Sequence, residues 1–278
     1  MKKYSLGYSP CPNDTFIFYA LVHGKIDLDG FLLEEPVLQD VEQLNTWALS
    51  GRLDITKLSF HALGHVLDEY CVLSAGSALG RGCGPLLIAG SKMNTGDISE
   101  KRIAIPGRLT TAALLLQMFL PECTQLVEMR FDHIMDAVMT GHVDGGVIIH
   151  ESRFTYKDKG LVCLQDLGEW WEKETDMPIP LGCIAVRRDL GEETIARIDR
   201  AISDSVGYAF SHPESCLPYI RSKSQETDLG VVQSHIELYV NDFSKDIGTE
   251  GLAAVQLFLE KGRKVGVLPE NSLEIMQR

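Results

Sequence analysis

The stretch Asp144–Phe154, with the sequence DGGVIIHESRF, contains an apolar run that ends in a histidine. Val147 to Ile149 predicts a short buried strand, and His150 follows it directly. Residues just past the carboxyl ends of strands line the ligand crevice of an open α/β sheet. His150 is therefore a candidate site residue. The alternative is a surface histidine, or a core histidine whose hydrogen bonds are satisfied.

The composition is that of an ordinary globular protein, with 45% hydrophobic and 23% charged residues. A chain of 278 residues suffices for one large domain or two modest ones. The net charge of −13 disfavours nucleic acid or an anionic membrane as the main partner, but permits an anionic small molecule in a local basic pocket. The seven cysteines form no C-x-x-C pair and fit reduced thiols. With no recognisable signal peptide or membrane span, we expect a cytoplasmic protein.

The first unit of the chain is a predicted strand, Tyr4–Ser9, followed by a proline-containing loop and a helix over Thr15–His23. Asn13 or Asp14 is the expected N-cap of that helix. Backbone N–H groups and the positive end of the helix dipole would then face a ligand, which suits an anion. The alternative is that Asn13 and Asp14 only cap the helix.

A polar end is also expected on the strand Leu53–Ser59, where Lys57 and Ser59 point to the same side. A lysine in an apolar strand end is costly to bury without an anion, so Lys57 is a candidate for binding a carboxylate. The alternative is that its side chain extends to solvent. His61 and His65 lie one helical turn apart, but no third metal ligand is near in the sequence, so we expect surface histidines and no metal site.

The segment Gly76–Gly84 has four glycines, but a strand, Leu86–Ala89, follows it. A nucleotide-binding loop would lead into a helix, so nucleotide binding is excluded. Further on, Thr110 or Thr111 is expected to cap an apolar helix over Ala112–Phe119. This helix N-terminus again suits an anion, with plain capping as the alternative.

Two blocks of alternating strands and helices are joined by extended apolar segments near 84–92 and 178–188. This order predicts an α/β protein with two lobes and a ligand cleft between them. We expect residues 1–88 and 185–278 to form the first lobe and residues 89–184 to form the second, inserted lobe.

Five motifs carry a resemblance to a known family: SPCPNDTF at 9–16, TKLS at 56–59, LGRG at 79–82, PGRLTT at 106–111 and IHESRFTY at 149–156. With these motifs in this order, the chain closely resembles the 1,4-dihydroxy-6-naphthoate synthases of the futalosine route to menaquinone. The resemblance covers nearly the whole chain, and no motif position departs from the family pattern.

The resemblance implies a periplasmic-binding-protein-like fold of the second type, adapted to catalysis. It implies cleavage of an anionic small molecule, cyclic dehypoxanthinyl futalosine, to 1,4-dihydroxy-6-naphthoate with release of a three-carbon fragment. It further implies that His150 is the base and that Lys57, Leu58, Ser59, Thr110 and Thr111 contact the substrate. Asn13 and Asp14 are possible further contacts. Because aromatisation drives the reaction, no metal or redox cofactor is expected.

Two other functions stay open at this point. One is a non-catalytic solute-binding protein of the same fold, which would have no need of the His-Glu-Ser-Arg block. The other is the sister enzyme of the pathway, which dehydrates chorismate on a related two-lobed fold. The Ser-Pro-Cys-Pro-Asn-Asp segment resembles the naphthoate synthases and not the chorismate enzyme.

Overall fold

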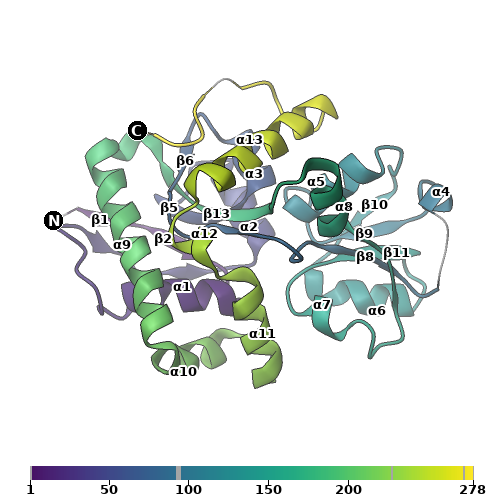
Figure 1. The fold of residues 1–278 in the computed structure, drawn as a ribbon, viewed down its shortest axis with the longest axis horizontal. Helices are drawn as coiled ribbons and strands as arrows, with labels where there is room; N and C mark the ends of the chain where they lie inside the picture. The colour runs from purple at the N-terminus through teal and green to yellow at the C-terminus, as the bar shows by residue number, and fades with distance from the viewer. Residues whose placement is uncertain (1, 92–94, 227, 272, 278) are drawn as a thin grey trace.

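The structure is a computed structural model that describes residues 2–91, 95–226, 228–271 and 273–277. Two separate β-sheets with flanking helices form two lobes that lie side by side (Figure 1). The α/β class predicted from the sequence is confirmed.

The first sheet has six strands in the order β4-β2-β5-β13-β6, with β7 paired to β13. Strands β2, β4 and β5 are parallel, whereas β13 is antiparallel to β5, β6 and β7. Because β2 and β5 are parallel neighbours, the residues that follow them meet at one edge of the sheet. The strands are β2 (Leu6–Tyr8), β4 (Val37–Leu38), β5 (Ile55–Ser59), β6 (Tyr70–Val72), β7 (Ala78–Gly80) and β13 (Ile179–Arg187); β1 (Lys3–Tyr4) and β3 (Leu32–Leu33) pair separately.

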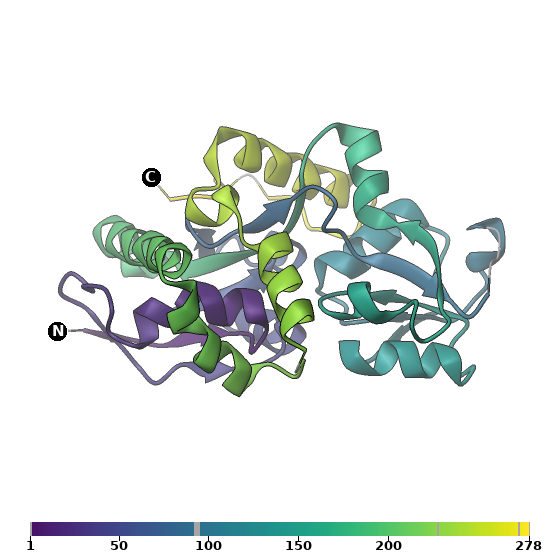
Figure 2. The same ribbon diagram turned by 60° about the horizontal axis from the view of Figure 1, so that its bottom comes forward.

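Helices cover both faces of this sheet. Alternate residues of β13 point to opposite faces. Ile184 packs in the core with α1, α9, α10 and α11, whereas Cys183 packs in the core with α3 and α13. Figures 1 and 2 show α1 beside α9, α10 and α11. The helices of this lobe are α1 (Pro12–Val22), α2 (Val41–Ala48), α3 (Phe60–His65), α9 (Glu192–Ser211), α10 (Pro213–Lys223), α11 (Leu229–Tyr239), α12 (Asp242–Lys245) and α13 (Gly248–Lys264), with the 3-10 turn η2 (Arg188–Leu190).

The second sheet has five strands in the order β10-β9-β11-β8-β12. Strands β9, β10 and β11 are parallel, and β8 is antiparallel to both β11 and β12. Its strands are β8 (Leu86–Ala89), β9 (Ile103–Ile105), β10 (Leu126–Glu128), β11 (Gly145–Ile148) and β12 (Val162–Asp166). Its helices are α4 (Thr95–Ile98), α5 (Thr111–Phe119), α6 (Ile134–Met139), α7 (Ser152–Thr155) and α8 (Leu167–Thr175), with the 3-10 turn η1 (Phe131–His133).

Two connections join the sheets. The chain passes from β7 in the first sheet to β8 in the second, and returns from α8 to β13 in the first. Strand β13 already pairs with β7 at Ile179. The boundaries predicted at residues 88 and 185 stay a prediction.

The helix that follows β2 begins earlier than the sequence predicts. Its N-cap is Cys11, whose side chain makes no capping hydrogen bond, and Pro12 occupies the first helical position. A proline fits there because the first N–H groups of a helix have no partner within it and the proline φ is already helical. The prediction of Asn13 or Asp14 as N-cap is therefore wrong, and both side chains are available for other contacts.

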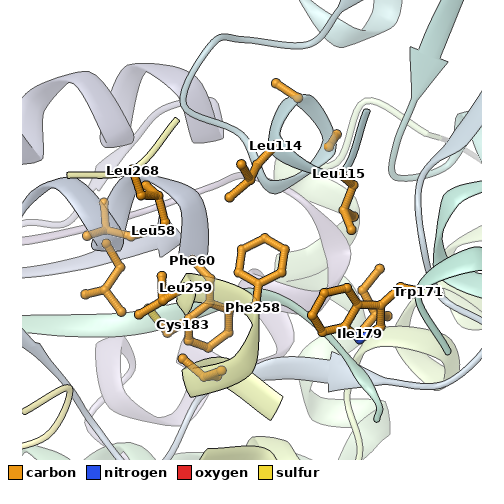
Figure 3. Packing of buried hydrophobic residues seen from close by; sticks show 14 of the residues in the cluster. Leu58, Phe60, Leu114, Leu115, Trp171, Ile179, Cys183, Phe258, Leu259 and Leu268 are labelled. Atoms are coloured by element: carbon orange, nitrogen blue, oxygen red, sulfur yellow. The ribbon is translucent and has the colours of Figure 1, made fainter. Parts of the chain in front are cut away.

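One hydrophobic core extends through both lobes. Figure 3 shows Phe258 of α13 among Leu114 and Leu115 of α5 and Trp171 of α8. The rings of Phe258 and Trp171 meet edge to face, with centroids 5.5 Å apart. Helix α13 thus belongs to the first lobe in sequence but packs against helices of the second.

Six of the seven cysteines are buried, and Cys163 on β12 is exposed. None of the helices in the described ranges is both long and apolar enough to cross a membrane.

Candidate active site

The two lobes enclose a cavity with about 670 Å³ of empty space, including the part that opens to solvent. A cavity between two lobes is a usual place for a small-molecule site. The cavity is lined by every site residue predicted from the sequence: Asn13, Asp14, Lys57, Leu58, Ser59, Thr110, Thr111 and His150. The structure brings them together from α1, β5, the N-terminus of α5 and the end of β11. Their roles toward a substrate stay predictions.

Lys57 forms a buried ion pair with Asp14, with 3.0 Å between Nζ and Oδ1. Lys57 also donates to the carbonyl of Gly76 at 3.2 Å. Asp14 accepts three further hydrogen bonds, from the Ser9 N–H at 3.2 Å, the Ser9 hydroxyl at 2.7 Å and the Asn13 amide at 2.9 Å. The anion that a buried lysine requires is thus supplied by the chain itself. The alternative that Lys57 extends to solvent is wrong, because its side chain is buried.

The end of β5 is held by side chains of α2. Asn45 is fully buried and accepts from the backbone N–H of Ser59 at 2.9 Å while donating to the Ser59 hydroxyl at 3.1 Å. It also donates to the carbonyl of Leu109 in the second lobe at 3.2 Å. Glu42, one turn before Asn45, accepts from the Leu109 N–H at 3.0 Å. Asn45 and Glu42 therefore position Ser59 and the loop before α5 together.

The N-terminus of α5 points into the cavity. Thr110 caps it by accepting from the Ala113 N–H at 3.2 Å, which confirms the predicted cap. The Thr111 hydroxyl donates to the carbonyl of Leu181 at 2.7 Å. The N–H groups of Thr111 and Ala112 meet no acceptor among the described residues. Both residues line the cavity, so this helix end can bind an anion.

Strand β11 ends at Ile148, one residue earlier than predicted, and His150 follows Ile149 in a left-handed backbone conformation, with φ 56°. A non-glycine residue in this region stores strain, which is frequent at functional sites. The ring is half-buried and meets Phe131 edge to face at 5.0 Å. Burial lowers the pKa of His150 below its ordinary value, while the charges of Glu151 and Asp14 oppose this shift. A neutral imidazole beside a cavity can accept a proton near pH 7.

The structure adds residues that the sequence did not indicate. Tyr239 at the end of α11 lines the cavity, and His235, one turn earlier, stacks on His150 with centroids 5.8 Å apart. His61 is buried and its Nδ1 lies 3.0 Å from the carbonyl of Thr110, so the expectation of a surface histidine is wrong there. Burial lowers the pKa of His61 to about 4. No local motif marks Tyr239 or His235, and the spacing of His61 and His65 did not reveal the contact with Thr110, because the partners lie far away in the sequence.

Arg153 has a structural role that the sequence left open. Its guanidinium donates to the carbonyls of Gly82 and Gly84 and pairs with Asp166 at 2.6 Å. It thereby ties α7 to the connection into β8 and to the start of α8. Glu151 lies with its Oε1 4.0 Å from Nδ1 of His235.

No cluster of three or more His, Cys, Asp or Glu side chains that could hold a metal ion occurs in the described part of the chain. The rings of His61 and His65 are tilted by 43° with centroids 5.3 Å apart, and no third such side chain among the described residues completes a site there.

Comparison with known proteins identifies the family. Residues 4–264 match the family model described as menaquinone biosynthesis. The chain is 51% identical over 261 residues to the 1,4-dihydroxy-6-naphthoate synthase of Thermus thermophilus, covering 94% of each chain. It is 41% identical over 269 residues to the enzyme of the same name from Streptomyces coelicolor, covering 95% of this chain and 94% of that one.

Solved structures confirm the fold. A protein of Archaeoglobus fulgidus is 37% identical, with a TM-score of 0.90 over 96% of this chain and 98% of that one. The alkanesulfonate-binding protein of Xanthomonas axonopodis has a TM-score of 0.71 at 14% identity, over 98% and 96% of the two chains. The predicted periplasmic-binding-protein-like fold is therefore confirmed. The chain belongs to the menaquinone biosynthesis family, together with the 1,4-dihydroxy-6-naphthoate synthases of Thermus thermophilus and Streptomyces coelicolor.

Proposed function

We propose that this chain is a cytoplasmic carbon–carbon lyase of the futalosine route, which converts cyclic dehypoxanthinyl futalosine to 1,4-dihydroxy-6-naphthoate. Two relatives that align with nearly the whole chain are named 1,4-dihydroxy-6-naphthoate synthase. The observation that carries the proposal is the position of His150, with a lowered pKa, on a cavity that also presents the free N–H groups of α5.

In the proposed reaction, neutral His150 takes a proton from a sugar-derived hydroxyl or carbon of the substrate. The carbon–carbon bond to the three-carbon fragment then breaks, and the naphthalene ring becomes aromatic. A positioned base of this kind contributes roughly 10²–10⁴-fold to the rate. The strained backbone and the ring contact with Phe131 hold the imidazole in place.

The substrate carboxylate is best placed at the N-terminus of α5. The N–H groups of Thr111 and Ala112 are available there, and the helix dipole favours negative charge. The charge of Lys57 is already neutralised by Asp14, and one of its N–H groups donates to Gly76. Lys57 therefore offers the substrate one free N–H group and little net charge. Ser59, Leu58 and Asn13 complete the proposed contact surface.

The test is a turnover assay of the purified protein with the cyclic substrate, followed by chromatographic detection of the naphthoate. We expect His150→Asn to lower kcat by about 10²–10⁴-fold, with substrate affinity nearly unchanged. His142→Asn, at an exposed histidine of the same lobe, is the matched control and should keep full activity. A His150→Asn variant with more than about a tenth of the wild-type rate would refute the base assignment.

The same preparation separates the two other functions. Calorimetric binding of the cyclic substrate without product would favour a solute-binding protein. Turnover of chorismate, with none of the cyclic substrate, would favour the dehydratase.

A further inference from the structure

His235 on α11 is a fully buried histidine whose hydrogen bonding is only half satisfied. Its Nε2 lies 3.0 Å from Oδ1 of Asn13. The amide nitrogen of Asn13 donates to Asp14, so Oδ1 is the acceptor and His235 carries its proton on Nε2. Its Nδ1 is then unprotonated and can only accept a hydrogen bond, but it has no hydrogen-bond partner among the described residues. Oε1 of the Glu151 carboxylate lies 4.0 Å from this nitrogen.

The ring of His235 is stacked on the ring of His150 in a nearly parallel, offset arrangement, with an interplanar angle of 12° and centroids 5.8 Å apart. His235 belongs to the first lobe and His150 to the second. On its own lobe, His150 meets Phe131 at 5.0 Å. The imidazole at the cavity is therefore in contact with one ring from each lobe. His235 itself does not line the cavity.

We propose that His235 is a positioning residue for His150, which holds the imidazole in its orientation and excludes water from one of its faces when the lobes are together. The proposal rests on the proposed function, in which His150 is the base. An aliphatic side chain at this position would avoid burying an unpartnered nitrogen, but it would stack no ring on His150, so core filling alone does not account for the ring found here.

The electrostatic surroundings of His150 make this effect measurable. The charged groups near it are Glu151 on its own loop, Asp14 on α1, Lys57 on β5 and Asp40 before α2. Burial is the largest influence on its pKa and lowers it. Burial, and the neighbouring His150, also lower the pKa of His235 well below its ordinary value, so His235 stays neutral and presents an uncharged ring face to His150. Opening that face to water should raise the pKa of His150.

Two variants isolate the stacked ring. His235→Phe and His235→Leu both lose the hydrogen bond to Asn13, but only His235→Phe keeps an aromatic ring against His150. For His235→Leu we expect kcat to fall by roughly 10- to 100-fold, since small displacements of a reacting group are costly. KM should stay within about threefold, and the acidic limb of the kcat profile should move to higher pH. For His235→Phe we expect both kcat and the pH of the acidic limb of its profile to stay close to the wild-type values.

Equal losses in the two variants, or an unmoved acidic limb in His235→Leu, would overturn the proposal. Thermal denaturation of each variant comes first. If His235→Leu does not fold, His235→Gln replaces it with the same expected result, because glutamine can donate to Asn13 but has no ring. His142→Leu serves as the control for loss of an exposed histidine.

A measurement without substrate separates this proposal from the proposed function. The His150 imidazole is titrated by NMR in protein labelled at its histidine nitrogens, in wild type and both variants. Its pKa should rise in His235→Leu and stay in place in His235→Phe; an unchanged value in both would refute the role. If wild type fails to convert the cyclic substrate, the proposed function fails, but the titration still tests the contact between the two histidines.

Discussion

The buried pair of Lys57 and Asp14 joins β5 to α1 at the wall of the cavity. Both side chains are almost fully buried, so neither charge is stabilised by bulk water. Removing one member of such a pair leaves the other uncompensated, and the cost exceeds the net contribution of the pair.

We predict that Asp14→Asn lowers the free energy of unfolding by about 3–5 kcal/mol, because Lys57 loses the carboxylate with which it forms its buried ion pair. Urea denaturation at pH 7 measures this. The control is Asp136→Asn, which breaks a largely exposed ion pair with Lys159 and should change stability little. A similar loss of unfolding free energy in the two variants would show that the buried ion pair matters no more for stability than the exposed one.

The sequence revealed these residues but not how they pair. Lys57 was identifiable because a lysine stood in an apolar strand, and His150 because it ended one. The partner of Lys57 lies 43 positions away in the numbering of the chain, at Asp14, and looked like a helix cap. His235 and Asn13 are 222 residues apart, so only the folded topology could bring them together.

At the scale of elements, the connection into β8 packs directly on the start of α8. The backbones of Gly84 and Gly168 approach so closely that a Cβ on Gly168 would lie 2.7 Å from Cα of Gly84. The backbone N–H of Leu167 donates to the carbonyl of Pro85 at 3.0 Å in the same contact. Backbone cannot rotate aside as a side chain can, so the contact requires glycine at both positions.

We predict that Gly168→Ala destabilises the protein by about 2–3 kcal/mol through this overlap, as measured by thermal and urea denaturation. Gly207→Ala is the matched control. Gly207 lies inside α9 with no atom near an added Cβ, so alanine should stabilise the protein by about 0.5–1 kcal/mol. A stable Gly168→Ala variant would mean that α8 can shift away from β8.

Strand β8 spans Leu86–Ala89 as predicted, because a continuous apolar run between a proline and a glycine leaves little choice. The start of α1 was missed because Pro12 was interpreted as a residue before the helix rather than its first residue. The need for Gly84 was not predictable, because the reason lies in a helix more than 80 residues later.

At the scale of the whole molecule, hydrogen bonds connect the lobes around the N-terminus of α5. Glu42 and Asn45 contact Leu109, His61 contacts Thr110, and Thr111 contacts Leu181. Burial raises the pKa of Glu42 to about 7, although the Leu109 N–H and Asn45 oppose the shift. Since the ordinary value is 4.5, the folded protein binds this proton more tightly than the unfolded chain.

The contribution of Glu42 to stability is therefore fully present below about pH 4.5 and is lost as the pH rises through about 7. Glu42→Gln stays neutral and can still accept from Leu109. We predict that the free energy of unfolding falls less in Glu42→Gln than in wild type between pH 5 and pH 8. The difference between the two falls should be about 1 kcal/mol, a small value because Glu42 is only half-buried and solvent screens its charge. Urea denaturation across this pH range, with exposed Glu122→Gln as control, measures the difference. Parallel curves for wild type and Glu42→Gln would contradict the assignment.

The distribution of thiols allows a spectroscopic probe to be attached to the native chain at one exposed cysteine. Six cysteines are buried, and burial raises the pKa of Cys83 and of Cys183 to about 12, so these thiols react slowly in the folded protein. A maleimide dye or nitroxide should attach at Cys163, on β12 of the second lobe. One added cysteine on the exposed side of α9 would complete a pair of probes. The distance between them would report the opening of the lobes in solution, with every native residue of the cavity in place.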